Sequence, residues 1–98
     1  MAHVPIVDEN LSAAVAGTPM DIEGAGEHKF TVFIRDGGTS IVGTILLEVQ
    51  RPGDDTWNLV ETYTTYPQFK TGELAGAYRL RLRVSVYSSG VAETTLSQ

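Results

Sequence analysis

The chain has 98 residues, a formal net charge of −5 and no cysteine. This length fits one domain with one core, and the lack of cysteine excludes disulfides, thiolate metal sites and thiol catalysis. No apolar run reaches the ~18 residues that a membrane-spanning helix needs, and an acidic chain lacks the broad cationic surface of a non-specific nucleic-acid binder. We therefore expect no membrane and no nucleic acid among its partners.

The beginning of the chain is predicted to form an arm and two short strands. Residues 1–10 form the arm, because Pro5 interrupts regular strand pairing and the stretch is short and mixed. Residues 10–15 are predicted as a first short strand, and residues 20–23 as a brief edge strand. The remaining chain, residues 11–98, is expected to be a single domain.

The next segment alternates between apolar and polar residues with the period of two that a β-strand requires. In residues 28–35 one face is expected to be buried and to hold three apolar side chains, Phe30, Val32 and Ile34. After a glycine-containing turn at 36–40, residues 41–51 are predicted as a strand whose pattern shifts near Gly43. An isolated glycine inside a strand often marks a bulge or a bend, so an irregularity is expected there.

A turn and a long connection follow. Residues 52–55, Pro-Gly-Asp-Asp, predict a reversal that makes residues 56–64 the hairpin partner of the preceding strand. Residues 65–75 are expected to form a connection that includes one short strand near Phe69. Three aromatic side chains are expected in the core, Trp57, Phe30 and Tyr78.

Residues 76–87 carry the clearest strand pattern in the chain. A period of two places one set of residues on the core face, Tyr78, Leu80, Leu82, Val84 and Val86. The opposite face, toward water or a partner, holds Arg79, Arg81, Arg83, Ser85 and Tyr87. After a turn at 88–90, residues 91–96 are predicted as the closing strand.

About six to eight strands at short, regular spacing and no convincing helix predict an all-β fold. The expected architecture is a single antiparallel β-sandwich of jelly-roll or Ig-like Greek-key topology, preceded by the arm. Several strand orders stay open, because the irregularity at Gly43 and the long connection allow different pairings.

No pattern in the chain favours catalysis, and we expect no enzyme, cofactor or metal. His3 and His28 lie in separate segments without the spacing of a dyad or a metal pair. A calcium site of Asp36 with two neighbouring turn aspartates, Asp54 and Asp55, is considered, but such residues are usual in turns. Glu48 and Glu61 are expected on the solvent face opposite the arginines rather than as a glycosidase carboxylate pair.

The arginine stripe of Arg79, Arg81 and Arg83 allows two explanations. The three guanidiniums could form cross-strand pairs with glutamates of neighbouring strands, or they could lie at a subunit or partner interface, where the planar guanidinium is favoured. So small a domain cannot bury all of its other aromatic residues, so some are expected at an interface or on a ligand-stacking platform. These are Phe33, Tyr63, Tyr66, Phe69 and Tyr87.

The order of several segments resembles a known kind of protein. The segments are Gly24-Ala-Gly-Glu-His-Lys-Phe-Thr-Val, Gly43-Thr-Ile-Leu-Leu-Glu-Val-Gln, the turn Pro-Gly-Asp-Asp-Thr-Trp57 and the strand Gly76-Ala-Tyr-Arg-Leu-Arg-Leu. Together they resemble the small β-sandwich accessory proteins of tailed bacteriophage virions, which decorate capsids or build head fibres and tail attachments. The resemblance covers most of residues 24–98.

The resemblance implies a non-enzymatic capsid decoration protein that binds the major capsid protein or another virion protein, with trimers frequent. It implies that the N-terminal segment grips the shell or a neighbouring subunit through His3, Val4, Pro5, Ile6 and Val7. Arg79, Arg81, Arg83, Phe33 and Tyr87 are the candidate subunit interface. The expected location is the capsid surface of the virion, after assembly in a bacterial cytoplasm. The alternative is a carbohydrate- or receptor-binding module in which Tyr63, Tyr66 or Phe69 stacks on sugar rings.

Overall fold

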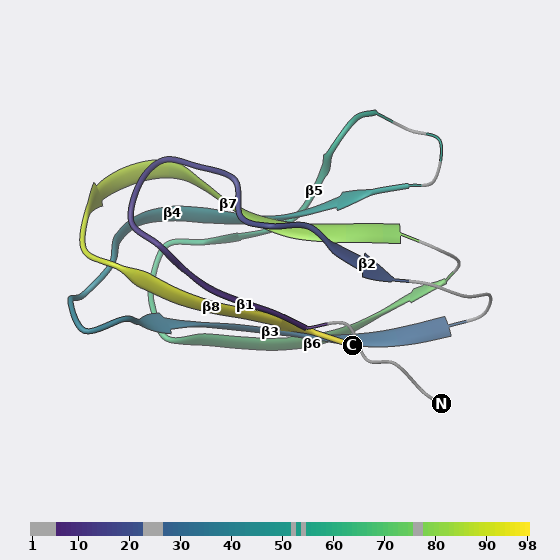
Figure 1. Ribbon diagram of the computed structural model, residues 1–98, viewed down its shortest axis with the longest axis horizontal. Coiled ribbons are helices and arrows are strands. Elements are labelled where there is room, and N and C mark those ends of the chain that lie inside the picture. Colours follow the sequence, from purple (N-terminus) through teal and green to yellow (C-terminus); the bar gives the residue numbers. More distant parts are fainter. Residues whose placement is uncertain (1–5, 23–26, 52, 54, 76–77) are drawn as a thin grey trace.

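The protein is described by a computed structural model for residues 6–22, 27–51, 53, 55–75 and 78–98. These residues form two stacked antiparallel sheets of four strands each (Figure 1). The strands are β1 (Ile6–Leu11), β2 (Met20–Ile22), β3 (Glu27–Asp36), β4 (Val42–Gln50), β5 (Asn58–Tyr63), β6 (Gln68–Ala75), β7 (Tyr78–Ser89) and β8 (Ala92–Ser97).

The strand order identifies the topology. Sheet A holds the strands in the order β1-β8-β3-β6, and sheet B holds them in the order β2-β7-β4-β5. The first strand therefore pairs with the last, the second with the seventh, the third with the sixth and the fourth with the fifth. A long hairpin rolled into two sheets has this order, which is that of an eight-stranded jelly roll. The predicted antiparallel β-sandwich is confirmed, with jelly-roll rather than Ig-like topology.

The core lies between the two sheets, where the apolar faces of the strands meet. The inward residues of β3 and the first half of β7 are buried as their alternation predicted. Burying each such side chain stabilises the fold by roughly 1.5–3 kcal/mol. The largest fully buried side chains in this core are Met20, Ile22, Val32, Ile34, Ile45, Leu47, Leu80, Leu82, Val84 and Leu96.

The first strand spans Ile6–Leu11, so the prediction of a strand at residues 10–15 is wrong for all but its first two residues. Residues 6–10, which were assigned to the arm, lie in β1 and pair with β8 along their whole length, from Ile6 opposite Ser97 to Leu11 opposite Ala92. The partner strand comes from the other end of the chain, so no local pattern announces this pairing. The brief edge strand near residue 20 is present as β2, which pairs with β7.

The expected connection at 65–75 is mostly strand. β6 pairs with β3 over eight residue pairs, from Gln68 opposite Ile34 to Ala75 opposite Glu27. Its positions opposite the buried residues of β3 are Gln68, Lys70 and Gly72, so the apolar alternation that marks a half-buried strand is missing. A Cβ at Gly72 would collide with the Phe30 ring, and the lack of one makes room for that ring in the core.

The alternation of β7 reverses in its second half. Ile45 of β4 is opposite Val84, but Thr44 is opposite Val86, which leaves Ser85 as an extra residue in β7. A bulge of this kind shifts the following side chains to the other face. Val86, predicted in the core, is therefore 56% exposed, and Tyr87, predicted outside, packs against the core.

The irregularity expected at Gly43 is confirmed, because the pairing of β4 with β7 also shifts between Val42 and Gly43. A Cβ at Gly43 would collide with the carbonyl oxygen of Val86, so the close approach of the two strands requires glycine. The prediction for Trp57 is wrong, because this side chain is half-buried outside the core cluster. The side chain of Tyr78 lies outside the described part of the chain.

Candidate functional site

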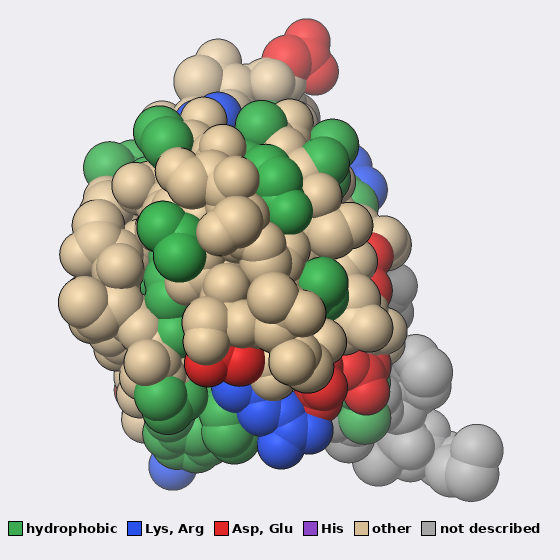
Figure 2. Space-filling view, turned by 90° about the vertical axis from the view of Figure 1, so that its left-hand side faces the viewer, with side chains coloured by type: hydrophobic (Ala, Val, Ile, Leu, Met, Phe, Trp, Pro, Cys, Tyr) green, Lys and Arg blue, Asp and Glu red, His purple; other side chains and the backbone are tan. Residues whose placement is uncertain are grey.

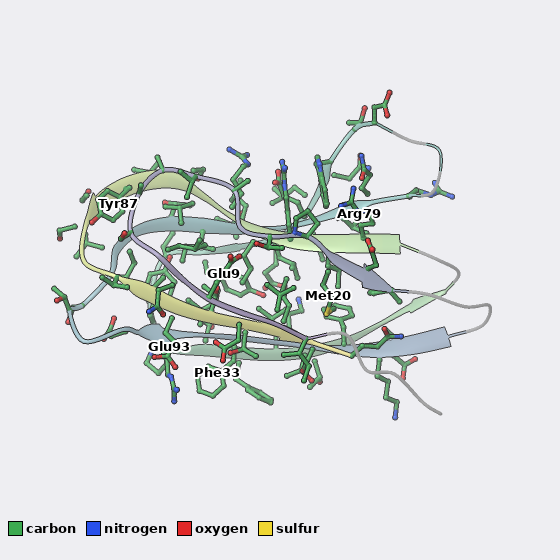
Figure 3. The ribbon with its side chains drawn as sticks, in the orientation of Figure 1. Glu9, Met20, Phe33, Arg79, Tyr87 and Glu93 are labelled. Carbon is green, nitrogen blue, oxygen red and sulfur yellow. The ribbon has the colours of Figure 1, made fainter. Side chains whose placement is uncertain are left out.

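The arginine stripe lies on the outer face of sheet B, where its guanidiniums already have partners. Arg79 Nε donates to Asp21 Oδ1 of β2 at 2.9 Å. Arg81 Nε and Arg83 Nε both donate to Glu48 Oε1 of β4, at 2.9 and 3.1 Å. Figure 3 shows Arg79 pointing away from the core. The explanation by cross-strand pairing is confirmed, with Asp21 as one of the two carboxylates.

Glu48 and Trp57 complete this face. Glu48 is only 6% exposed beneath the arginines. Burial would raise the pKa of its carboxyl, but hydrogen bonds from Arg83 and Arg81, together with their positive charges, hold that pKa below its usual value. The guanidinium of Arg81 also lies over the Trp57 ring, 4.2 Å from its centroid. The guanidiniums of the stripe are thus paired with carboxylates of neighbouring strands in the same sheet.

Glu61 does not join Glu48 on this face. It is opposite Leu47, and its carboxylate forms an ion pair with Lys70 of β6. Because β5 and β6 are edge strands of different sheets, this pair closes one open side of the sandwich. Charged side chains at such edges also discourage pairing with another chain. The expected position opposite the arginines is wrong for Glu61, whereas Glu48 does lie opposite them but is buried rather than exposed to solvent.

The outer face of sheet A carries an aromatic pair, Phe33 and Phe69. These residues are opposite each other on β3 and β6, with ring centroids 5.7 Å apart at an interplanar angle of 88°. Phe69 is 65% exposed. The guanidinium of Arg35 lies 5.4 Å from the Phe33 ring centroid and is paired with Glu93. Figure 3 shows Phe33 directed away from the core beside Glu93.

The three aromatic residues assigned to a stacking platform are not brought together on the surface. Tyr63 is 5% exposed within the core, so it cannot contact a ligand. Tyr66 is half-buried, and its hydroxyl donates to the carbonyl oxygens of Gly43 and Tyr63 at 3.0 and 2.9 Å. Phe69 alone is available for stacking, and Phe33 stands at a right angle to it.

The residues predicted for a subunit interface are also dispersed. Tyr87 points inward, and its hydroxyl donates to the Gly90 carbonyl oxygen at 2.8 Å, so it does not share a face with the arginines. Ile6 is 63% exposed at the start of β1, whereas Val7 packs against the core. His3, Val4 and Pro5 lie outside the described residues.

The considered calcium ligands are separated. Asp36 ends β3 and accepts a hydrogen bond from Ile41 N at 2.9 Å, whereas Asp55 lies in the β4–β5 connection at the other end of the sandwich. Asp54, and the side chain of His28 in β3, lie outside the described part of the chain. Within the part that the structure describes, no three His, Cys, Asp or Glu side chains group as metal ligands, and no helix is long and apolar enough to cross a membrane.

A further surface was missed by the sequence analysis. It lies at the end of the sandwich where the β3–β4 and β7–β8 connections meet (Figure 1). Val42 and Val86 are 52% and 56% exposed there, and charged side chains are sparse (Figure 2). A signal was available, because the longest runs without charged residues include these connections.

The chain matches no protein-family model and no curated protein.

Proposed function

We propose that this protein is a non-enzymatic structural component of a tailed-phage virion, a decoration protein that binds the shell of major capsid protein. The observation that carries the proposal is the place of β1. This strand lies at the edge of sheet A, and within the described part of the chain it pairs with β8 alone, so no described strand covers its other edge. An open strand edge offers backbone groups to a partner chain. The preceding segment, with His3, Val4 and Pro5, continues from this strand.

The fold of the sandwich does not depend on disulfide formation. Its stability depends on an apolar core and on cross-strand ion pairs, with no disulfide. The edge strand is also fastened to the body. The inward Glu9 carboxylate accepts hydrogen bonds from Thr18 N and Thr18 Oγ1, at 2.5 and 2.9 Å. A capsid protein that binds the segment before Ile6 would therefore hold the whole domain, because β1 is attached to the rest of the sandwich.

The test compares the full chain with a variant that lacks residues 1–5. Deleting residues 1–10 is unsuitable, because this would remove most of β1 together with the contacts of Glu9. Each protein is mixed with empty shells assembled from the major capsid protein of the same genome and then sedimented. We expect the full chain to sediment with the shells and the shortened chain to stay in the supernatant.

Two results would count against the proposal. A full chain that does not sediment with shells removes the decoration role, and a shortened chain that binds equally well removes the arm as the anchor. Thermal unfolding of both proteins is the control. Equal midpoints show that the deletion leaves the sandwich intact.

Exposure of the aromatic pair supports a second candidate function, binding of a neutral carbohydrate or a receptor glycan. Phe69 is 65% exposed on a sheet face that also presents Thr31, Thr71 and Thr95. Aromatic rings and hydroxyls are suitable partners for sugar rings. A glycan array with the Phe69→Ala variant tests this function, with Leu59→Ala as the matched control because Leu59 is 60% exposed on sheet B.

A further inference from the structure

The four longest runs of the chain without Asp, Glu, Lys or Arg come together at one end of the sandwich. These runs are residues 10–20, 37–47, 62–69 and 84–92. Each run contains one connection, β1–β2, β3–β4, β5–β6 or β7–β8. These connections lie at the same end, on the left in Figure 1. This surface is termed the uncharged end. The β4–β5 connection at the other end carries Arg51 and Asp55.

The surface of the uncharged end is apolar and hydroxyl-rich. Figure 2 faces it directly and shows hydrophobic side chains scattered among uncharged polar groups, with the charged side chains gathered at the margin. Val42 and Val86 are 52% and 56% exposed there, and Val15 of the β1–β2 connection is 46% exposed. Val42 begins β4 and Val86 lies in the second half of β7, and both leave apolar area that a contacting surface would remove from water.

Hydrogen bonds hold these connections in one conformation. Gly37 N donates to Val91 O at 2.9 Å, and Val91 N donates to Thr39 O at 3.2 Å, so the β3–β4 and β7–β8 connections are bound to each other. The hydroxyl of Tyr66 anchors the β5–β6 connection to the Gly43 carbonyl oxygen at 3.0 Å. A surface that is already ordered loses little conformational entropy when it binds.

We propose that copies of this chain associate with one another through the uncharged end. The argument for a second copy is electrostatic. Each copy has a formal net charge of −5, and contact through most other surfaces brings carboxylates of the two copies close together. Contact through the uncharged end keeps most charges of each copy outside the interface, where salt screens them beyond about 8 Å. The nearest described carboxylate is that of Asp36 at the end of β3, which accepts a hydrogen bond from Ile41 N. This surface differs from the face of Arg79, Arg81 and Arg83, whose guanidiniums are already paired.

The size of the surface predicts a weak association. The Cα atoms extend 39 × 28 × 17 Å, and the uncharged end lies across the longest axis. Its cross-section of 28 × 17 Å corresponds to an area on the order of 500 Å² per copy. Stable protein interfaces bury about 800 Å² per partner. We therefore expect self-association that depends strongly on concentration rather than a permanent oligomer.

The test is sedimentation velocity of the full chain from about 10 μM to about 1 mM. We expect the weight-average mass to rise above 10.6 kDa as the concentration increases. Val42→Asp and Val86→Asp each place a charge inside the proposed contact and should weaken association at least about tenfold. Val86→Arg should weaken it too, although this variant reduces the net negative charge.

Leu59→Asp is the matched control. Leu59 is 60% exposed on β5, and the substitution adds the same charge away from the uncharged end. It should leave the association constant unchanged, and raising the salt concentration should not weaken association. A protein that stays monomeric over the whole range overturns the proposal. So does association that Leu59→Asp weakens as much as Val86→Asp. Equal thermal midpoints establish that the variants are folded, and none of these results depends on shell binding.

Discussion

Glu48 accepts a hydrogen bond from Arg81 Nε at 2.9 Å on the outer face of sheet B, although Glu48 itself is only 6% exposed. The same oxygen accepts a second bond from Arg83. If one member of a buried, hydrogen-bonded set of charges is removed, the remaining charges lose their partners, and this lowers the free energy of unfolding. Loss of the Glu48 carboxylate would therefore leave Arg81 and Arg83 without their shared acceptor.

Stability should fall in acid when Glu48 becomes protonated. The pKa of its carboxyl in the folded protein lies below the ordinary value of 4.5. Its contribution is therefore complete above that ordinary value and is lost as the pH falls through the folded-state pKa. At neutral pH, Glu48→Gln should lower the free energy of unfolding by about 1–3 kcal/mol. Urea unfolding from neutral to acidic pH should show this difference shrinking in acid, and a constant difference would contradict the prediction.

The contact between Arg81 and Trp57 can be followed by fluorescence, because Trp57 is the single tryptophan of the chain. Arg81→Lys keeps the charge but loses the planar group that lies over the indole. We expect a red-shifted emission and a loss of about 0.5–1 kcal/mol in stability. Arg79→Lys is the control, because Arg79 pairs with the exposed Asp21 and should change neither quantity measurably.

The two neighbouring tyrosines should respond in opposite ways to loss of the hydroxyl. The hydroxyl of Tyr63 is buried with no hydrogen-bond partner among the described residues, so Tyr63→Phe should be neutral or stabilise the fold by about 1 kcal/mol. The hydroxyl of Tyr66 donates to two carbonyl oxygens, so Tyr66→Phe should destabilise it by about 1 kcal/mol. Chemical denaturation of both variants checks this, and a costly Tyr63→Phe would contradict it.

Two glycines with similar backbone angles should tolerate alanine differently. Gly38 has φ 95° and Gly90 has φ 89°. A Cβ at Gly38 would meet nothing within 4 Å, so Gly38→Ala should cost only backbone strain of about 1 kcal/mol. A Cβ at Gly90 would collide with the Ser40 carbonyl oxygen, so Gly90→Ala should cost more than twice as much. Equal thermal midpoints for the two variants would refute this account.

Local alternation in the sequence predicted the strands whose inward side chains are apolar. It located β3 and the first half of β7 with their buried faces, because both pair with ordinary registers there. It failed for β6, whose inward positions are polar or glycine, and for the end of β7. There the bulge at Ser85 exchanges the faces of Val86 and Tyr87, and no residue type marks that position.

The candidate surfaces divide in the same way. Pairing of the arginine stripe with carboxylates was one of the explanations that the sequence allowed, but Asp21 comes from a strand far away in the chain. The prediction of an aromatic platform was wrong because Tyr63 is buried. The register of β4 with β5 shifts at a bulge, and Tyr63 then lies opposite the buried Ile45. Exposure of an aromatic residue depends on the register of its strand, which a single sequence does not contain.

By itself, the sequence determined the all-β class, the buried face of β3 and the irregularity at Gly43, because period-two alternation and a glycine within a strand are local properties. Only the tertiary structure decided the pairing of β1 with β8, the jelly-roll order and the place of the bulge in β7. It also brought the uncharged runs together. These features arise from hydrogen bonds between strands far apart in the chain, and their free energy depends on the whole fold rather than on any one segment.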